Sequence, residues 1–376
     1  MEGQMRLHIF NPEHDIALAA DMERFTAPHA GRQMRASLGF LPAFWAEHGD
    51  LVLVDDVEAA AEAVRHMKAF ARDVRFVSTA ALSHIDASEI EAVEPWGWDK
   101  TLCFQLTRAN MALQRLLPDA DRLARIRQIS SRQFAAEHLL PTLTAMDSRL
   151  IGESRYCSST EEVDRLLRDN GRSVIKSPWS CSGRGVRYVG AELDEHGRGW
   201  LRNVMAQQGG VTVEPLYQKV CDFGMEFFVD GLTPGKTTVR YCGLSLFDTT
   251  GGAYSGSILA TERDKRDMLA RNVDLQLLDK VTEAVTDLLA TSLSGVYSGP
   301  LGLDMMAVAN TDNPSDGLLL HPCVELNLRH TMGHVALALS PDEFGPHRLM
   351  RISYSSGKYK MRIMTTGENL LNTCMV

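Results

Sequence analysis

A short polar stretch after a lysine is the first candidate for chemistry. Residues 177–186 read SPWSCSGRGV and come directly after Lys176. Glycines let backbone N–H groups approach an anion, serines add hydroxyl donors, and lysine and arginine supply positive charge. The stretch lacks the G-x-x-x-x-G-K-[ST] pattern of P-loops and the G-x-G-x-x-G pattern of dinucleotide-binding proteins. It therefore predicts a phosphate-binding loop of another type, and the alternative interpretation is a surface hairpin turn.

Carboxylates further along the chain favour the phosphate interpretation. Asp304 lies in GPLGLDMMAVA, and Glu325 and Asn327 lie in LLLHPCVELNLR, two apolar segments that predict the strands of a hairpin. With 310–317 as the connecting loop, Asp304 faces Cys323, on the face that Glu325 and Asn327 share. Two carboxylates and an amide oxygen suit Mg²⁺, with Mn²⁺ as a substitute, beside nucleotide phosphates. The alternative is a set of solvated strand acids, which the apolar surroundings disfavour because a buried acid without a partner is costly.

The elements that position these residues follow from hydrophobic periodicity. Short apolar strands alternate with helical segments in the first part of the chain, and this alternation predicts a parallel sheet. The strands expected there are 6–10, 50–56 and 73–78, with a helix over 57–71. Further on, the pattern predicts helices over 101–117, 159–171 and 274–293, a helix that Pro141 stops, and strands in RSVIKSP, GVTVEPLYQKV, MEFFVDG and GKTTVRYCGLSLFD.

Composition limits the class of protein. A chain of 376 residues with 44% hydrophobic residues is long enough for two or three domains. A net charge of −9, without a Lys/Arg-rich stripe, argues against nucleic acid as a partner. The absence of a signal-peptide pattern and of a long apolar window predicts a cytoplasmic protein that does not bind membranes. Seven scattered cysteines without a C-x-x-C pair indicate reduced thiols. Small molecules are the expected partners, and a homodimer is left open.

Taken in order, these features resemble the ATP-grasp superfamily, which includes biotin carboxylase and D-alanine–D-alanine ligase. The resemblance covers roughly residues 130–335 and rests on the order of the motifs: a lysine before a glycine-rich loop, then VEPL, then GLD and VELNLR. It implies an ATP-grasp fold in three parts. These are an N-terminal parallel-sheet domain over 1–129, a lid subdomain over 130–213, and a C-terminal catalytic subdomain with a mixed or antiparallel sheet over 214–376.

The resemblance also implies a nucleotide site. Lys176 would bind the ATP phosphates, and Glu214 would accept a hydrogen bond from the adenine amino group. Backbone groups of Pro215 and Leu216 would meet the edge of the ring. Glu226, in FGMEFFV, resembles an acid on the ribose or metal side. The loop that would cover the phosphates contributes Ser182, Gly183, Arg184 and Gly185.

Near the end of the resemblance, the motif implies the metal and substrate sites. Asp304, Glu325 and Asn327 resemble magnesium ligands of the family. Arg329 completes an E-x-N-x-R pattern, and in relatives such an arginine steadies the substrate carboxylate or the acyl phosphate. Arg329 and Lys176 are therefore the expected catalytic residues.

One position departs from the family pattern. The family usually has two lysines, the earlier one some forty-odd residues before the second. Lys176 matches the second, and the residue 44 positions before it is Arg132, not a lysine. Arginine can hold phosphate through two parallel hydrogen bonds, so Arg132 can take this role. Lys100, in WGWDK, is the alternative, although it lies further upstream.

The function that the resemblance implies is ATP-dependent ligation. A carboxylate would attack the γ-phosphate, and an amine or other nucleophile would displace phosphate from the acyl phosphate, so that ADP and phosphate are released. A kinase that stops after phosphoryl transfer is one alternative, which Arg329 disfavours. A non-catalytic nucleotide-binding regulator is another, since the family lysine is missing at position 132.

Two polar motifs remain open. In NPEHD (11–15), Asn11 and Pro12 suit the N-cap and the first position of a helix, but loops beyond the carboxyl end of a strand also contact ligands. His330 and His334 have the i, i+4 spacing of metal ligands without a third partner, which favours helix-start or substrate-facing histidines.

Overall fold

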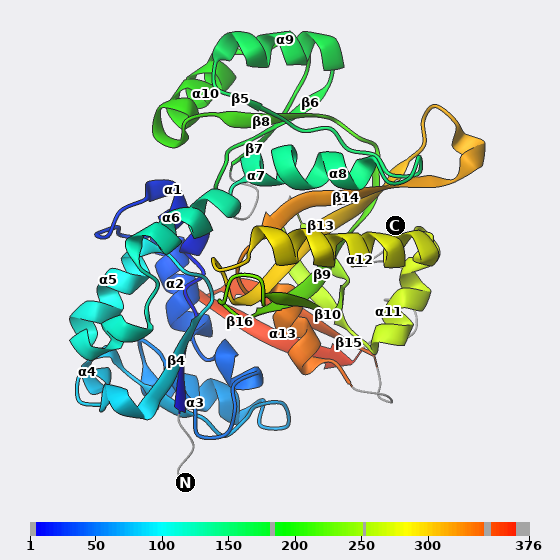
Figure 1. Ribbon diagram of the computed structural model, residues 1–376. Helices are drawn as coiled ribbons and strands as arrows, with labels where there is room; N and C mark the ends of the chain where they lie inside the picture. The colour runs from blue at the N-terminus through cyan, green and yellow to red at the C-terminus, as the bar shows by residue number, and fades with distance from the viewer. Residues whose placement is uncertain (1–4, 181–184, 251–252, 342–346, 366–376) are drawn as a thin grey trace.

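Four sheets of four strands each make up the strand content of the computed structural model, which describes residues 5–180, 185–250, 253–341 and 347–365 (Figure 1). The N-terminal sheet is parallel and the other three are antiparallel. The prediction of a mixed α/β fold, with a parallel sheet first and antiparallel sheets after it, is therefore confirmed. No helix in these ranges is long and apolar enough to span a membrane.

The N-terminal sheet has the strand order β3-β2-β1-β4, so the chain reverses direction across the sheet at β1. Loops that follow β1 and β4 therefore meet at the carboxyl edge, where open α/β sheets bind ligands. The strands are β1 (Met5–Ile9), β2 (Leu51–Leu53), β3 (Arg75–Val77) and β4 (Ile90–Pro95). The helices are α1 (His14–Ala20), α2 (His29–Leu38), α3 (Val57–Arg65), α4 (Thr79–Leu82), α5 (Lys100–Ala109) and α6 (Ala120–Ile129).

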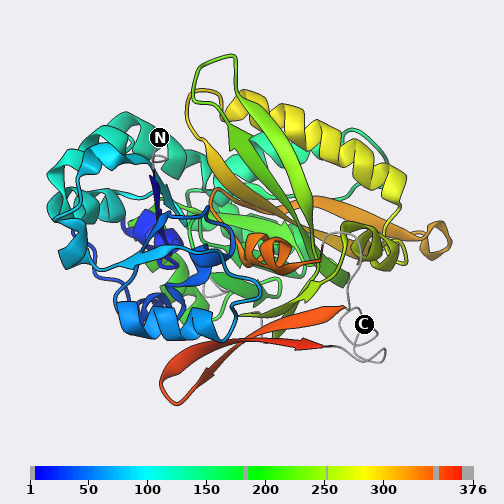
Figure 2. The same ribbon diagram turned by 90° about the horizontal axis from the view of Figure 1, so that it is seen from below.

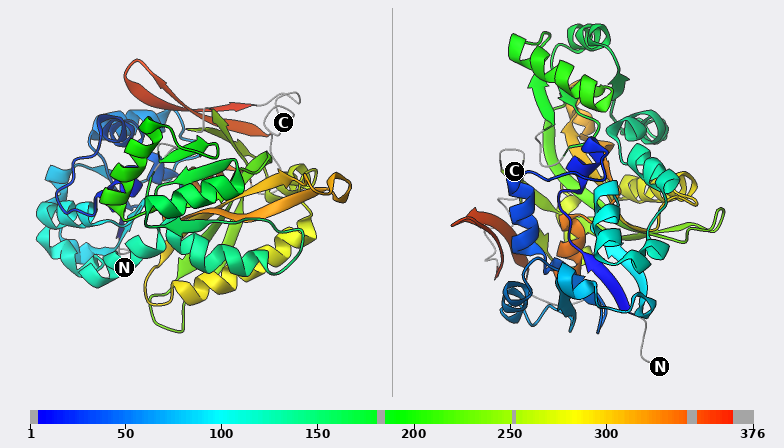
Figure 3. Two further views of the ribbon diagram at one scale, coloured as in Figure 1. Left: turned by 90° about the horizontal axis from the view of Figure 1, so that it is seen from above. Right: turned by 90° about the vertical axis from the view of Figure 1, so that its left-hand side faces the viewer.

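The lid sheet, formed by β5 to β8, stands above the N-terminal domain, as the right-hand view of Figure 3 shows in green. Its strands are β5 (Arg155–Cys157), β6 (Ser173–Lys176), β7 (Val186–Val189) and β8 (Val211–Pro215), in the order β5-β8-β6-β7. Helices α9 (Thr160–Asn170) and α10 (Glu195–Gln208) complete a separate hydrophobic core. The expected capped helix is confirmed, because Ser159 and Glu162 form a capping box and Gly171 ends α9 with a φ of 74°.

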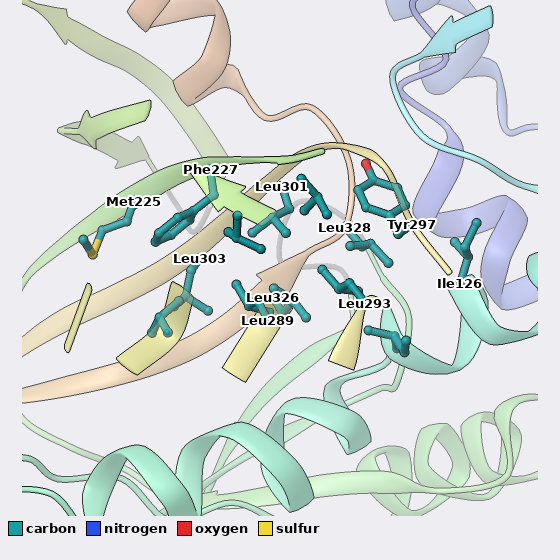
Figure 4. Packing of buried hydrophobic residues seen from close by; sticks show 14 of the residues in the cluster. Ile126, Met225, Phe227, Leu289, Leu293, Tyr297, Leu301, Leu303, Leu326 and Leu328 are labelled. Carbon is teal, nitrogen blue, oxygen red and sulfur yellow. The ribbon is translucent and has the colours of Figure 1, made fainter. Parts of the chain in front are cut away.

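The central sheet has the order β10-β9-β13-β14 and carries the predicted acids. Apolar side chains of alternate residues, among them Phe227, Leu303 and Leu326, pack with Leu289 of α12 in the largest core (Figure 4). Since side chains alternate along a strand, the residues between them point to the opposite face. The elements are β9 (Lys219–Asp230), β10 (Thr238–Ser245), α12 (Leu275–Ser292), β13 (Gly299–Ala309), β14 (Leu318–Asn327) and α13 (Met332–Leu339).

A fourth sheet joins the central part of the chain to its end. Its order is β11-β12-β15-β16, and β15 and β16 are the two red strands of Figure 2. Helix α2 of the N-terminal domain packs on β16. The strands are β11 (Phe247–Thr250), β12 (Ala253–Leu259), β15 (Arg348–Ser355) and β16 (Lys358–Thr365), and α11 (Glu262–Leu269) follows β12.

The β13–β14 hairpin corrects the predicted register. Ala309 pairs with Leu318, as expected, but the register shifts between Asp304 and Met306. Asp304 consequently lies opposite Glu325 and not opposite Cys323. Here 322–324 of β14 lie against Met305 alone, so the irregularity adds two residues to β14 without a signal in the alternation of the sequence. The shift places the two carboxylates directly across from each other.

The segment after α6 also differs from its prediction. Pro141 does not stop the helix there, because it lies in the first turn of α8 (Leu140–Thr144), where its missing N–H costs nothing. Residues from Arg132 to Thr144 form a continuous helical segment of α7 (Arg132–Phe134), the π-helical turn η4 (Ala135–Leu139) and α8. This segment packs on β14 of the central sheet, whereas the lid sheet begins only at Arg155.

Gly97 provides a test of how the loops after β1 and β4 pack. Its carbonyl accepts a hydrogen bond of 2.8 Å from Asn11, and a Cβ at this position would lie 2.6 Å from the ring of His14. We expect Gly97→Ala to lower the free energy of unfolding by about 1–3 kcal/mol, because the buried imidazole must move. Chemical denaturation measures this change.

Gly190→Ala is the matched control, since a Cβ there has no neighbour within 4 Å. Equal unfolding free energies for the two variants would contradict the close packing of Gly97 on His14.

Candidate active site

Acidic side chains gather on the face of the central sheet that lies opposite α12. Asp304 faces Glu325 across β13 and β14, and the amide of Asn327 donates to Asp304 at 3.2 Å. Glu226 joins them from β9, where Gly224 pairs with Asp304. The predicted metal ligands are therefore brought together, with Glu226 on the same face.

Burial sets the electrostatics of these acids. Burial, and after it the charge of Glu325, raises the pKa of Asp304 to about 7. A divalent cation between the two carboxylates would remove this repulsion, and Asp304 and Glu325 offer the hard oxygen donors that Mg²⁺ prefers. The amide of Asn327 turns its N–H group toward Asp304 and its oxygen toward Arg329, so this side chain would have to turn to bind a cation. In the described part of the chain, no group of three His, Cys, Asp or Glu side chains could hold a metal alone. Water or a bound ligand would have to supply the remaining ligands.

Lys176 reaches toward these acids from the lid sheet. Its ammonium lies 2.6 Å from the Glu214 carboxylate and 3.5 Å from the carbonyl of Val324, and both charged side chains are buried. Glu214 also accepts a hydrogen bond of 3.1 Å from Ser154. Glu214 is thus the direct partner of Lys176. The sequence predicted only a contact between Glu214 and adenine, and not this ion pair.

The hinge residues after Glu214 are only partly open to a nucleotide. Pro215 ends β8, and the N–H of Leu216 donates to the carbonyl of Arg172 at 2.9 Å. The Leu216 N–H is therefore occupied, and the contact of Pro215 and Leu216 with the ring of a base stays a prediction. Carbonyl oxygens remain the backbone groups that could make this contact.

Arg132 links the phosphate loop to the acids. Its guanidinium donates to the Ser177 carbonyl at 2.7 Å, to the Ser180 hydroxyl at 2.8 Å and to the Glu325 carboxylate at 2.7 Å. The Nε of Arg132 is buried and has no hydrogen-bond partner among the described residues. Lys100, the alternative, instead pairs with Asp21 at 2.7 Å. The structure therefore places Arg132, and not Lys100, beside the loop.

The predicted phosphate loop is described only at its ends. Ser182, Gly183 and Arg184 lie outside the described residues, so their role stays a prediction. Gly185 accepts a hydrogen bond of 2.8 Å from the N–H of Ser177, and a Cβ at Gly185 would overlap the Ser177 hydroxyl. Before the loop, Trp179 donates to the Arg127 carbonyl at 3.0 Å and stacks under the Arg127 guanidinium at 3.7 Å. These contacts fix both ends of the loop.

Arg329 has a different partner from the one expected. Its guanidinium forms a fork with Asp15 of the NPEHD motif, at 3.1 Å from Nε and 2.9 Å from Nη2. It also donates to the Asn327 amide oxygen at 2.7 Å and to the His330 carbonyl at 3.0 Å. Burial alone would raise the pKa of Asp15, but the charge and the hydrogen bond of Arg329, together with the charges of His14 and Arg132, outweigh it and lower that pKa. Arg329 therefore orients Asn327 and the N-terminal loop, and its fork is not open to a substrate carboxylate.

The NPEHD motif is more than a helix cap. Asn11 is not the N-cap, because its side chain bonds to the Gly97 carbonyl and to Asp99, and α1 begins only at His14. Pro12 consequently lies before the helix. With Asp15 on Arg329, the loop contacts the candidate site directly.

Thr331 and His334 are site residues that the sequence did not reveal as such. Thr331 donates to Glu226 at 2.8 Å and forms a capping box with His334 at the start of α13. This confirms the helix-start interpretation of His334, whereas His330 is buried between Trp45 and Trp96. The only signal was Thr331 before an apolar helix, three residues ahead of His334.

The carboxyl group of Glu226 favours its protonated form. His334 donates from Nε2 to the Phe227 carbonyl at 3.2 Å, and its Nδ1 accepts from the N–H of Thr331 at 3.1 Å. Since burial lowers the pKa of His334 to about 4, the neutral ring, whose Nδ1 lies 3.0 Å from Glu226, supplies no charge to stabilise a carboxylate. Burial raises the pKa of Glu226 to about 8, so the carboxylic acid is the favoured form at neutral pH.

Comparison with known proteins finds distant similarity to solved structures. No family model and no curated protein matches. Similar solved structures include N5-carboxyaminoimidazole synthetase from Staphylococcus aureus complexed with ADP, with 9% identity, a TM-score of 0.48, and coverage of 94% of this chain and 83% of that chain. The corresponding ribonucleotide synthetase from Thermus thermophilus has 13% identity, a TM-score of 0.48, and coverage of 98% of this chain and 96% of that chain.

A biotin carboxylase from Campylobacter jejuni gives 12% identity, a TM-score of 0.49, and coverage of 93% of this chain and 76% of that chain. Likenesses with identities and TM-scores this low carry no argument about what this chain does. The function has to be argued from the contacts above.

The proton on Glu226 predicts a pH dependence of stability. Its pKa is about 8 in the folded protein, whereas a free glutamate titrates near about 4.3. Between these values the unfolded chain releases a proton that the folded protein keeps, so stability is lost as pH rises toward 8. We expect Glu226→Gln to remove this part of the loss, so that the variant gains stability relative to the natural protein between about pH 5 and 8.

Chemical denaturation at a series of pH values measures the effect. Parallel stability profiles for the two proteins would show that Glu226 is ionised in the folded state.

Proposed function

We propose that this protein is an ATP-grasp ligase, which joins a carboxylate to an amine or other nucleophile and releases ADP and phosphate. The observation that supports the proposal most directly is the position of Arg132. Its guanidinium contacts two parts of the proposed site, the base of the predicted phosphate loop at Ser177 and the acid Glu325 on the central sheet. Phosphates bound between lid and central sheet would meet this guanidinium and Lys176.

Mg-ATP, when bound, would supply the phosphoryl group, and the metal would neutralise charge on its oxygens. Asp304, Glu325 and Asn327 would hold the metal from the central sheet. Lys176 and Arg132 would hold the phosphates through charge-assisted hydrogen bonds. Because Asp304 has a pKa of about 7, it would give up a proton when a cation binds.

The outcome of phosphoryl transfer is not settled by Arg329. The sequence pattern assigned this residue to the acyl phosphate and so favoured a ligase over a kinase. In the structure, however, Arg329 holds Asp15 and Asn327. The ligase interpretation therefore depends on the arrangement of Lys176, Arg132 and the acids, and the kinase and the non-catalytic regulator become the outcomes against which it is tested.

Trapping of the acyl phosphate is the experiment that separates these outcomes. The protein is incubated with Mg-ATP, hydroxylamine and a set of carboxylates, and ADP and hydroxamate are measured. We expect ADP release that depends on one carboxylate class, with the hydroxamate formed in equal amount. A stable phosphorylated alcohol without hydroxamate would identify a kinase, and nucleotide binding without ADP release would identify a regulator.

The buried pair of Lys176 and Glu214 provides a test of nucleotide binding. Removal of the lysine alone would leave Glu214 buried without a partner, so the pair is replaced together as Lys176→Met with Glu214→Gln. We expect the dissociation constant for ATP to rise at least about tenfold, because a phosphate ligand is lost. Isothermal titration calorimetry measures this constant.

The matched control replaces a pair on the lid helices, as Arg198→Gln with Asp164→Asn. Both double variants remove one positive and one negative charge. Unchanged ATP affinity in a folded Lys176/Glu214 variant would exclude this part of the lid sheet from the nucleotide site.

A further inference from the structure

A cavity lies in the N-terminal domain, between residues 21–28 and helix α5. Its volume of about 710 Å³ is within the range of small-molecule pockets. The residues of the candidate active site do not line it. In Figure 1, the segment that follows α1 runs out toward α5 and α6. The cavity is therefore separate from the proposed nucleotide site.

Two exposed arginines with no acidic partner among the described residues line this cavity. The guanidinium of Arg24 lies 5.4 Å and that of Arg108 lies 5.8 Å from the centre of the Phe104 ring. Neither forms an ion pair or hydrogen bond with any described residue. Their positive charge favours an anion in the cavity, and guanidinium groups hold a carboxylate through charge-assisted hydrogen bonds.

The walls of the cavity are fixed before any ligand binds. The hydroxyl of Thr101 donates to the Met22 carbonyl at 2.7 Å, and Lys100 pairs with Asp21 at 2.7 Å. Both contacts hold the segment after α1 against the first turn of α5. Because the segment is already ordered, a ligand would not have to meet the entropic cost of ordering it.

The remaining lining specifies the kind of anion. Phe25 and Phe104 are half-buried and offer apolar surface. Gln105 accepts a hydrogen bond from Arg35 at 3.4 Å through its amide oxygen, so its amide N–H groups are left as a neutral donor. Glu23 is the one acid among the lining residues and would repel a polyanion such as a phosphate ester. These features together suit a singly charged ligand with an apolar part.

We propose that this cavity binds a small organic carboxylate whose charge rests on a flat apolar group. The carboxylate binds the arginines that line the cavity, Arg24 and Arg108, and the apolar group lies against the two phenylalanine rings. This assignment is independent of the proposed ligase activity, because it uses no residue of the candidate active site.

Ligand-detected ¹⁹F NMR with three probes tests the proposal on the intact protein. 4-Fluorobenzoate carries both the charge and the ring, 4-fluorobenzamide carries the ring alone, and trifluoroacetate carries the charge alone. We expect 4-fluorobenzoate to bind at least about tenfold more tightly than either other probe. Equal binding of the amide, or no binding of 4-fluorobenzoate at about 10 mM, would overturn the proposal.

Variants locate the probe. We expect Arg24→Gln with Arg108→Gln to weaken 4-fluorobenzoate binding at least about tenfold. The control is Arg125→Gln with Arg202→Gln, which changes the net charge equally at two exposed arginines outside the cavity. Equal losses in both variants would indicate a general charge effect and overturn the site. Displacement of the probe by Mg-ADP would place it in the nucleotide site and would overturn the proposal as well.

Discussion

Asp304 and Glu325 face each other across two neighbouring strands, and the repulsion between these two carboxylates is the constraint on which the surrounding arrangement depends. Repulsion of this kind is much stronger inside a protein than in water. Each acid consequently has its own donor, Asn327 on Asp304 and Arg132 on Glu325. These donors come from different parts of the chain, so the constraint also draws the helical segment after α6 and the base of the lid onto the central sheet.

The fold could be predicted where the signal is local. Alternation of strands and helices indicated the parallel sheet, and Ser159 with Glu162 indicated the start of α9, because each pattern is contained within a few residues. The errors have physical reasons. Pro141 was expected to end a helix, but a proline in the first turn of the next helical segment disturbs nothing. The hairpin register was wrong by two residues near Asp304, since a bulge leaves the alternation on either side intact.

The candidate site divides in the same way. Lys176 and the acids of the hairpin could be selected from their strands, and the structure brings them together. The pair of Asp15 and Arg329 could not, because the two residues are 314 positions apart and only the complete fold makes them neighbours. The sequence pattern that ends in Arg329 also does not say which carboxylate the guanidinium binds. In the folded protein this carboxylate belongs to Asp15 of the same chain.

The π-helical turn between α7 and α8 has a consequence for how this chain can vary. Each residue of an α-helix turns the chain by about 100°. A π-helical turn holds one residue more than the α-helical turn that it replaces, so loss of one residue from 135–139 would leave an α-helical turn and keep Arg132 on its side of the helix. Loss of residue 133 or 134 has no such reserve, and it would swing Arg132 away from Ser177 and Glu325 if α8 keeps its packing on β14. The chain can therefore vary in length at the π-helical turn but not in the residues between this turn and Arg132.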